Sequence, residues 1–274
     1  MAYLMKRHKI SQRKACRLVE QNRSTQRYRP EAPEEEQRLI RAMNELAAKH
    51  PQWGYRMVCQ LLREGGWRVN PKRIERLWRL EGHRIPPSKA KESGRKAEGT
   101  AQNSAWRRRA TAPNDIWSYD FMSGRTRHGG PIRILNIVDE FTRVALGTHV
   151  SRSIGSADLQ DVLEKTINRH GVPRLIRSDN GREFISTTII EWLEQRGIEA
   201  AFIEKGRPQQ NAYVERFNGS MRRELLNQEE FDSVLEARVL IEEWVDQYNT
   251  VRPHRGLKML TPLAFSRAYS EGTK

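Results

Sequence analysis

The spacing of apolar residues changes abruptly near residue 113, and this change restricts the folds open to the chain. Before it, apolar residues recur every three or four positions, as on a helix predicted over 34–49, whose apolar stripe is Leu39, Ile40, Met43, Leu46 and Ala47. After it, runs of β-branched and aromatic residues predict strands. We therefore expect an all-helical front followed by an α/β domain.

The front contains several short predicted helices. Ser11 to Gln21 places Ala15, Leu18 and Val19 on one face, and 23–28 looks like a turn that opens a second short helix, a weak helix-turn-helix signal. Further helices are predicted over 34–49 and 55–63. Asn70-Pro71 is an N-cap followed by proline at the first helical position, so another helix begins there. In it, Ile74, Leu77 and Trp78 face the core.

Positive charge is concentrated in this front. Residues 1–110 contain 27 Lys and Arg against 11 Asp and Glu, whereas residues 111–274 contain 22 against 23. An anionic partner is indicated, and DNA is favoured over lipid because no amphipathic helix carries bulky apolar anchors. Lys72, Arg76 and Arg79 recur at i, i+4 and i+7 on the helix after Asn70, so we predict a recognition helix. The competing interpretation is an ordinary solvated basic face.

Two classes of protein are disfavoured. No apolar stretch has the length of a signal peptide or membrane span, so we expect a cytoplasmic protein. Cys16 and Cys59 lie in different predicted helices without paired Cys or His ligands, which argues against a disulfide framework or a zinc site; we expect both to be buried or half-buried. The predicted domains are a helical region over 1–82, a basic linker over 83–113 and an α/β core with C-terminal helices over 114–274.

Beyond residue 113 the elements predict a mixed five-stranded α/β core. Three successive strands should form an antiparallel meander, and a β-α-β order follows. The predicted strands cover 116–122, 132–138, 144–150, 175–178 and 200–203. One predicted helix ends near 170–171, and the others cover 188–196, 210–226 and 233–248. The first of these has on one face Leu159, Val162, Leu163, Thr166 and Ile167. The helix at 210–226 should have a polar face of Asn211, Glu215, Asn218 and Arg222 and a buried face of Val214, Phe217, Met221 and Leu225.

Three carboxylates stand out by their placement. Asp120 lies inside the first strand, where an unpaired carboxylate is costly unless a cation or strong donors meet it. Asp179 ends the fourth strand, and Glu215 follows in a helix, with 35 residues between the two. Oxygen donors of this kind suit Mg²⁺ or Mn²⁺, and two such ions can support in-line displacement at phosphorus. With 34 acidic residues in the chain, a chance triple of turn caps or solvated charges is the alternative.

The sequence around these carboxylates strongly resembles the integrase core of retroviral integrases and insertion-sequence transposases, and more closely the second-frame product, OrfB, of the IS-three family. The motifs are Trp117-Ser118-Tyr119-Asp120, the stretch 178–184, the stretch 206–218 and Tyr248-Asn249-Thr250-Val251-Arg252-Pro253-His254. Trp53-Gly54-Tyr55-Arg56 and Asn70-Pro71-Lys72-Arg73 resemble the family's upstream DNA-binding segment.

The resemblance implies a ribonuclease-H-like core with Asp120, Asp179 and Glu215 as the metal ligands of a DDE triad. It also implies cleavage at the element ends and strand transfer into DNA, with Mg²⁺ or Mn²⁺ as cofactor and two ions at the site. Asn180 and Gly181 are expected to shape the turn beside the metals. The expected DNA contacts are Lys72, Arg73, Arg76, Arg79, Arg207, Asn211, Tyr213 and Arg222.

Several alternatives stay open. Arg222 could be a solvated helix charge, and Arg207, Asn211 and Tyr213 could cap and pack the helix start. Asp139 and Glu140 are more plausible as turn caps than as metal ligands, and His254 as a structural or phosphate-contacting loop residue than as a base.

The expected partners are the element's terminal repeats and target DNA, with the chain acting as a homo-oligomer on DNA, where it would be associated with the nucleoid. In the family the full enzyme is usually a frameshift fusion with an upstream frame, so an upstream-frame partner is also considered. The competing functions are a nuclease that only hydrolyses and a DNA-binding regulator without activity.

Overall fold

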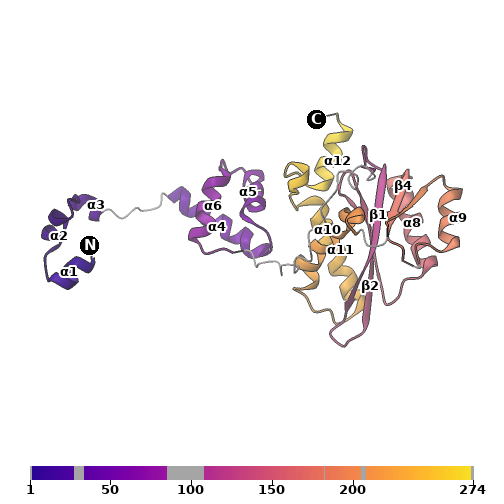
Figure 1. Cartoon of the computed structure of the whole chain (residues 1–274), viewed down its shortest axis with the longest axis horizontal. Helices are drawn as coiled ribbons and strands as arrows, with labels where there is room; N and C mark the ends of the chain where they lie inside the picture. Colours follow the sequence, from indigo (N-terminus) through magenta and orange to yellow (C-terminus); the bar gives the residue numbers. More distant parts are fainter. Residues whose placement is uncertain (1, 28–33, 85–107, 182, 205–207, 273–274) are drawn as a thin grey trace. The chain divides into compact units, whose positions relative to one another are not determined.

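The computed structural model describes residues 2–27, 34–84, 108–181, 183–204 and 208–272 (Figure 1). The chain divides into two compact units, Met1–Lys49 and His50–Lys274. Most of the predicted basic linker, from 85 to 107, lies outside the described residues. The predicted domain boundaries at 82 and 113 stay predictions.

The first unit consists of helices. These are α1 (Ala2–His8), α2 (Gln12–Leu18), α3 (Arg23–Arg27) and α4 (Glu34–Lys49). The predicted helices at 11–21 and 34–49 are confirmed, whereas α1 was not predicted. The second short helix is present as α3, but it already occupies Arg23–Arg27, where the sequence predicted the turn before it. The apolar face assigned to the second helix is wrong in part. Ala15 and Cys16 are buried, but Leu18 and Val19 are 64% and 46% exposed, because α2 ends at Leu18 and the chain turns away there.

Two further helices, α5 (Tyr55–Glu64) and α6 (Pro71–Leu80), contact each other. The predicted cap is confirmed: the Asn70 side chain accepts a hydrogen bond from the Lys72 backbone N at 2.9 Å. The predicted core face of α6 is confirmed as well, since Ile74, Leu77 and Trp78 are buried. Cys59 in α5 is buried, as is Cys16 in α2.

The rest of the chain is built on a five-stranded mixed sheet in the order β3-β2-β1-β4-β5. The strands are β1 (Ile116–Arg125), β2 (Pro131–Asp139), β3 (Ala145–Ser151), β4 (Leu175–Ser178) and β5 (Glu199–Phe202). β1, β2 and β3 pair antiparallel, and β1, β4 and β5 pair parallel. The predicted meander followed by a β-α-β order is therefore confirmed.

Helices cover both faces of the sheet (Figure 1). One face packs on α8 (Ser156–His170) and α9 (Thr187–Gln195) through a core that includes Trp117 and Leu135. The other packs on α10 (Ala212–Met221) and α11 (Val234–Thr250) through Phe217 and Trp244. Because successive strand residues point to opposite faces, Asp120 lies on the α10 side.

The C-terminal helices differ from the prediction in two ways. The helix expected over 210–226 is divided into a 3-10 turn, Pro208–Asn211, then α10, then a π-helical turn, Arg222–Leu226. A last helix, α12 (Pro262–Ser270), was not predicted; Thr261 caps it by accepting from the Ala264 backbone N at 3.2 Å. Across the described ranges, no helix is both long enough and apolar enough to cross a membrane.

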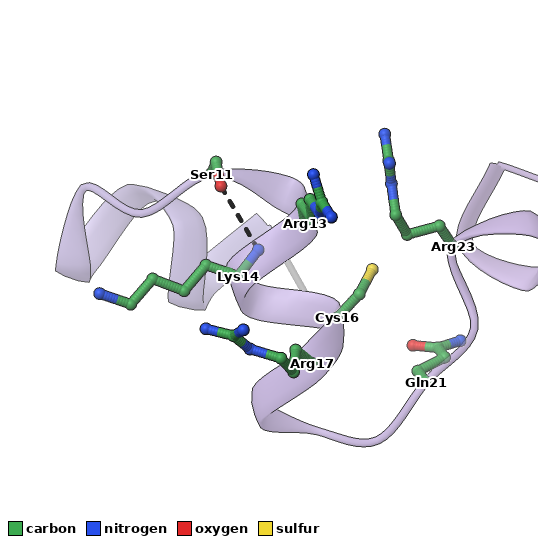
Figure 2. A pocket seen from close by; sticks show the side chains of 7 residues that line it. All are labelled: Ser11, Arg13, Lys14, Cys16, Arg17, Gln21 and Arg23. Atoms are coloured by element: carbon green, nitrogen blue, oxygen red, sulfur yellow. Dashed lines mark hydrogen bonds between the residues drawn. The ribbon is translucent and has the colours of Figure 1, made fainter.

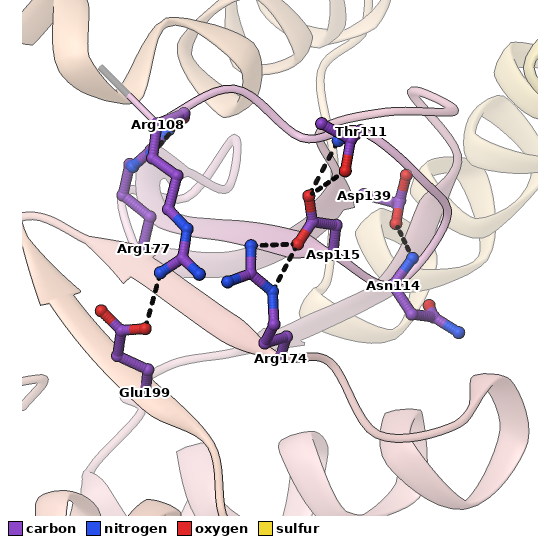
Figure 3. A network of polar contacts seen from close by, with 8 residues as sticks. All are labelled: Arg108, Thr111, Asn114, Asp115, Asp139, Arg174, Arg177 and Glu199. Carbon is purple, nitrogen blue, oxygen red and sulfur yellow. Dashed lines mark hydrogen bonds and ion pairs between the residues drawn. The ribbon is translucent and has the colours of Figure 1, made fainter. Parts of the chain in front are cut away.

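A polar network anchors the segment that leads into β1 (Figure 3). Asp115 accepts hydrogen bonds from the Thr111 backbone N at 2.8 Å and from Nε of Arg174 at 2.7 Å. The Asn114 backbone N donates to Oδ2 of Asp139 at 2.8 Å. These contacts fix where β1 begins, and thereby the position of Asp120 along it.

Asn249 of α11 contacts the start of β3. Its Oδ1 accepts from the Ala145 backbone N and its Nδ2 donates to the Ala145 carbonyl, each at 2.9 Å. The side chain is buried, so α11 is held against the sheet by a paired amide contact as well as by apolar packing.

Candidate active site on β1, after β4 and on α10

Asp120 lies in the middle of the sheet and is held by few donors. Its Oδ1 accepts from the Phe121 backbone N at 2.8 Å, and its Oδ2 accepts from Nδ2 of Asn218 at 2.9 Å. Burial, with the charges of Asp179 and Glu215 added to it, outweighs those two hydrogen bonds and raises the pKa of this carboxyl to about 6. The site therefore concentrates negative charge in a partly desolvated place.

A pair of amides connects α10 to the strand beside Asp120. Asn136 of β2 is the register partner of Asp120, and its Nδ2 donates to Oδ1 of Asn218 at 2.8 Å. Asn218 can then turn only its NH₂ group toward Asp120, which fixes the orientation of the carboxylate. Asn211 is buried and donates from Nδ2 to the Tyr119 carbonyl at 3.3 Å. Its burial favours the packing alternative over a DNA contact.

Asp179 follows β4 directly, in a turn built around it. The Gly181 backbone N donates to Oδ1 of Asp179 at 2.9 Å, and Nδ2 of Asn180 donates to the Ile203 carbonyl at 2.6 Å. A Cβ on Gly181 would lie 3.0 Å from that Asp179 oxygen and 3.1 Å from Cδ2 of Phe184. A side chain at this position would therefore press on the Asp179 carboxylate and the Phe184 ring, and one of them would have to shift by a few tenths of an ångström.

Glu215 lies on α10, where it is exposed, one turn before Asn218 and Gly219. The predicted buried side of this helix is confirmed for Val214, Phe217 and Met221. The predicted polar face divides in two, because Asn218 is turned into the site and Arg222 toward solvent. Over the described part of the chain, no three His, Cys, Asp or Glu side chains form a ready-made metal-binding group.

A buried ion pair between Arg177 and Glu140 lies next to the site. Arg177 precedes Asp179 by two residues and Ser118 precedes Asp120 by two, so both share the face of the carboxylates. Nη1 of Arg177 donates to both oxygens of Glu140, at 2.7 and 2.8 Å, and Ser118 Oγ also donates to Glu140. Glu140 is thus part of a buried ion pair and not a turn cap.

Asp139, by contrast, is a turn cap. Its Oδ1 accepts from the backbone N of Phe141 at 3.0 Å and of Thr142 at 2.7 Å. His254 is excluded as a general base near neutral pH, because burial and the charge of Arg252 lower its pKa to about 3. The burial of His254 agrees with a structural role in its loop.

Basic surfaces occur on the front helices. On α6, Lys72, Arg76 and Arg79 line one shallow pocket, where Arg79 is paired with Glu75 at 2.7 Å; Arg73 lies outside it and is half-buried. Figure 2 shows a second pocket, between α2 and α3. It is lined by Ser11, Arg13, Lys14, Cys16, Arg17, Gln21 and Arg23.

The remaining predicted residues are dispersed. Arg222 is exposed at the start of the π-helical turn, and Tyr213 packs under Arg143, whose guanidinium carbon lies 3.6 Å from the ring centre. Arg207 lies outside the described residues. Sequence reasoning missed Asn136, Arg177 and the role of Asn218; a polar residue inside an otherwise apolar strand was the only available signal for the first two.

An α/β sheet of this order, with acidic residues within β1, directly after β4 and on a following helix, is typical of polynucleotidyl transferases of the integrase-core class. Two family models described as "Integrase core domain" match residues 110–208 and 196–262, and one described as "HTH-like domain" matches 34–91. An intasome chain of simian T-cell lymphotropic virus is similar in fold, with a TM-score of 0.50 and 20% identity over 58% of this chain and 56% of that one.

The chain belongs to the family of insertion-element transposases. It is 34% identical to a 31.7 kDa protein of the insertion element IS407 of Burkholderia multivorans, over 97% of this chain and 94% of that protein. It is 30% identical to the transposase of the element IS904 of Lactococcus lactis, over 78% of this chain and 87% of that protein. The protein is a transposase, and it acts in DNA transposition and integration.

Proposed function

We propose that Asp120, Asp179 and Glu215 are the catalytic triad of this transposase. The observation that carries the proposal is the environment of Asp120: a carboxyl inside a sheet, with its pKa raised to about 6 by burial and by the two other acids. Such a placement is costly unless a cation offsets it. The donors are all oxygens, which suits Mg²⁺ or Mn²⁺.

Divalent ions, two in our proposal, would supply activation of the attacking oxygen and stabilisation of the leaving oxygen. The chain's own residues position the carboxylates. Asn218 and the Phe121 backbone N orient Asp120, the Gly181 backbone N orients Asp179, and the rigid α10 presents Glu215. Water attacks the phosphodiester at the element end, so that the P–O bond to the 3′-oxygen of the element breaks and a 5′-phosphate stays on the flanking DNA. The freed 3′-hydroxyl then attacks a phosphodiester of the target and displaces a 3′-hydroxyl of the target strand.

We further propose that the helical front holds DNA. Residues 2–27 contain eight Lys and Arg against one acid, Glu20, and the pocket of Figure 2 is lined by four of the basic residues. Lys72, Arg73, Arg76 and Arg79 of α6 form a second contact. Tyr213 and Arg222 are proposed as further DNA contacts, as is Arg207, which lies outside the described residues. The two basic surfaces support binding to DNA at the element ends. We propose that the chain acts there as a homo-oligomer, with or without an upstream-frame partner.

The test is a strand-transfer assay with oligonucleotides from the DNA that flanks the gene, in Mg²⁺ or Mn²⁺. Asp120→Asn, Asp179→Asn and Glu215→Gln should each lower joining by at least about a thousandfold, because each removes a charged ligand. Asp161→Asn, on the exposed surface of α8, is the matched control and should join like the wild type.

Two results would argue for the competing functions. Cleaved but never joined DNA would indicate a nuclease that only hydrolyses. Joining that persists in the three variants would exclude the proposed triad, and DNA binding with no reaction in the wild type would point to a regulator.

A further inference from the structure

An open pocket of about 730 Å³ lies beside α10, and Glu215 is part of its wall. Five arginines line it and Glu215 is its one acid; we call it the arginine pocket. The arginines are Arg143, Arg216, Arg223, Arg252 and Arg255. They come from the β2–β3 turn, from α10 and its π-helical end, and from the loop after α11, so the fold brings together segments more than a hundred residues apart.

Two of these arginines are held in place by the fold. Arg252 is paired with Glu224 through three contacts between 2.7 and 3.1 Å, and both side chains are largely buried. Arg143 lies over the Tyr213 ring and donates to the Glu140 carbonyl. These contacts hold one wall of the pocket in place, and among the described residues Arg143 forms no ion pair.

The other three arginines are exposed and available. Arg223 has one long contact, from Nη2 to Ser220 Oγ at 3.4 Å. Within the described ranges, neither Arg216 nor Arg255 has an ion-pair partner. Gly219 and Gly256 also line the pocket, so the protein backbone there is open to close approach. Guanidinium groups that converge in this way match the oxygens of phosphate.

We propose that the arginine pocket binds backbone phosphates of the DNA strand next to the phosphodiester that reacts at Glu215. This inference rests on the proposed function, since it takes Glu215 as a catalytic residue. The size of the pocket fits a stretch of sugar-phosphate chain better than a single small anion. The strand would belong either to the element end or to the target. The inference also gives the segment Arg252-Pro253-His254-Arg255 a role in holding DNA.

The experiment measures DNA binding by the full chain in EDTA, by fluorescence polarisation over a range of salt concentrations. The probes are a duplex with the element end and a duplex of unrelated sequence. The variant is Arg216→Ala/Arg255→Ala, and the matched control is Arg152→Ala/Arg169→Ala, which removes the same charge from exposed positions outside the pocket.

The pocket variant should bind at least one probe about tenfold more weakly than the control variant, with a salt dependence shallower by about 1 to 2 in log-log slope. If the affinity falls only for the end duplex, the pocket binds the element end; if it falls only for the unrelated duplex, the pocket binds the target. If the affinity falls for both, the pocket binds the backbone of either DNA. Equal binding by the two double variants on both probes would overturn the proposal.

Methylphosphonate substitution locates the contact. A neutral linkage next to the reacting phosphodiester should weaken binding by the wild type and leave the pocket variant unaffected, whereas an equal effect on both would refute the assigned position. Binding in EDTA does not depend on catalysis, so failure of the triad in the joining assay and failure of the arginine pocket are separate results.

Discussion

Replacing Asp120 by asparagine should stabilise the metal-free core at alkaline pH while it abolishes joining. Burial and the neighbouring acids raise the pKa of Asp120 from 3.8 to about 6. A carboxyl with a higher pKa in the folded chain binds its proton more tightly when folded, so the wild type loses stability as the pH rises from about 4 to about 6. The loss is complete above that range.

The magnitude follows from the shift. About two pKa units correspond to about 3 kcal/mol. The asparagine NH₂ would face the NH₂ of Asn218, whose oxygen is already bonded to Asn136, and one lost hydrogen bond costs about 1 kcal/mol. We expect Asp120→Asn to raise the free energy of unfolding by about 2 kcal/mol at pH 8 and to lower it by about 1 kcal/mol at pH 4.

The assay is urea unfolding in EDTA at both pH values, followed by tryptophan fluorescence, to which the buried Trp117 of β1 contributes. The exposed Asp161→Asn variant serves as the control, and its free energy of unfolding should differ from that of the wild type by the same small amount at pH 4 and at pH 8. If Asp120→Asn proved less stable than the wild type at pH 8, or shifted stability equally at pH 4 and pH 8, the electrostatic account of the site would be wrong.

Three further predictions concern the same site. Gly181→Ala should displace Asp179 and lower joining at least tenfold with a loss of about 1–2 kcal/mol in unfolding experiments; unchanged joining would contradict the close contacts of its Cβ. Arg177→Ala should lower the free energy of unfolding by about 3–5 kcal/mol, because it leaves Glu140 buried without its partner. A decrease of less than about 1 kcal/mol in a thermal unfolding experiment would refute this. Mg²⁺ should raise the melting temperature of the wild type but not of Asp120→Asn, as calorimetry can show; equal shifts would place the ion elsewhere.

Elements with a strong repeating pattern could be predicted from the sequence. The helix at 156–170 buries the five predicted residues, because its apolar stripe is regular over four turns. Asp120 within a strand, Asp179 at the end of one and Glu215 in a helix could be predicted as well, because the apolar pattern around each indicated those elements. The short α2 was predicted less well, since a helix of two turns has too few residues for its buried face to be inferred.

The contacts that orient the site could not be predicted. The hydrogen bond from Asn136 to Asn218 joins residues 82 positions apart, and the Arg177–Glu140 pair joins residues 37 apart. Both depend on strand register and on the packing of α10 against β2, which local propensity does not encode. The arginine pocket was missed in the same way, because its members come from segments that are distant in the sequence.

The paired amide contact of Asn249 with Ala145 has a consequence for solubility. β3 is an outer strand of the sheet, and outer strands present unpaired backbone groups to which another chain can add. By occupying both the N–H and the carbonyl of Ala145, Asn249 replaces one residue of a neighbouring strand and closes this end of β3 to edge-to-edge aggregation. If the chain acts as the homo-oligomer proposed above, such protection matters most where several copies lie close together on DNA.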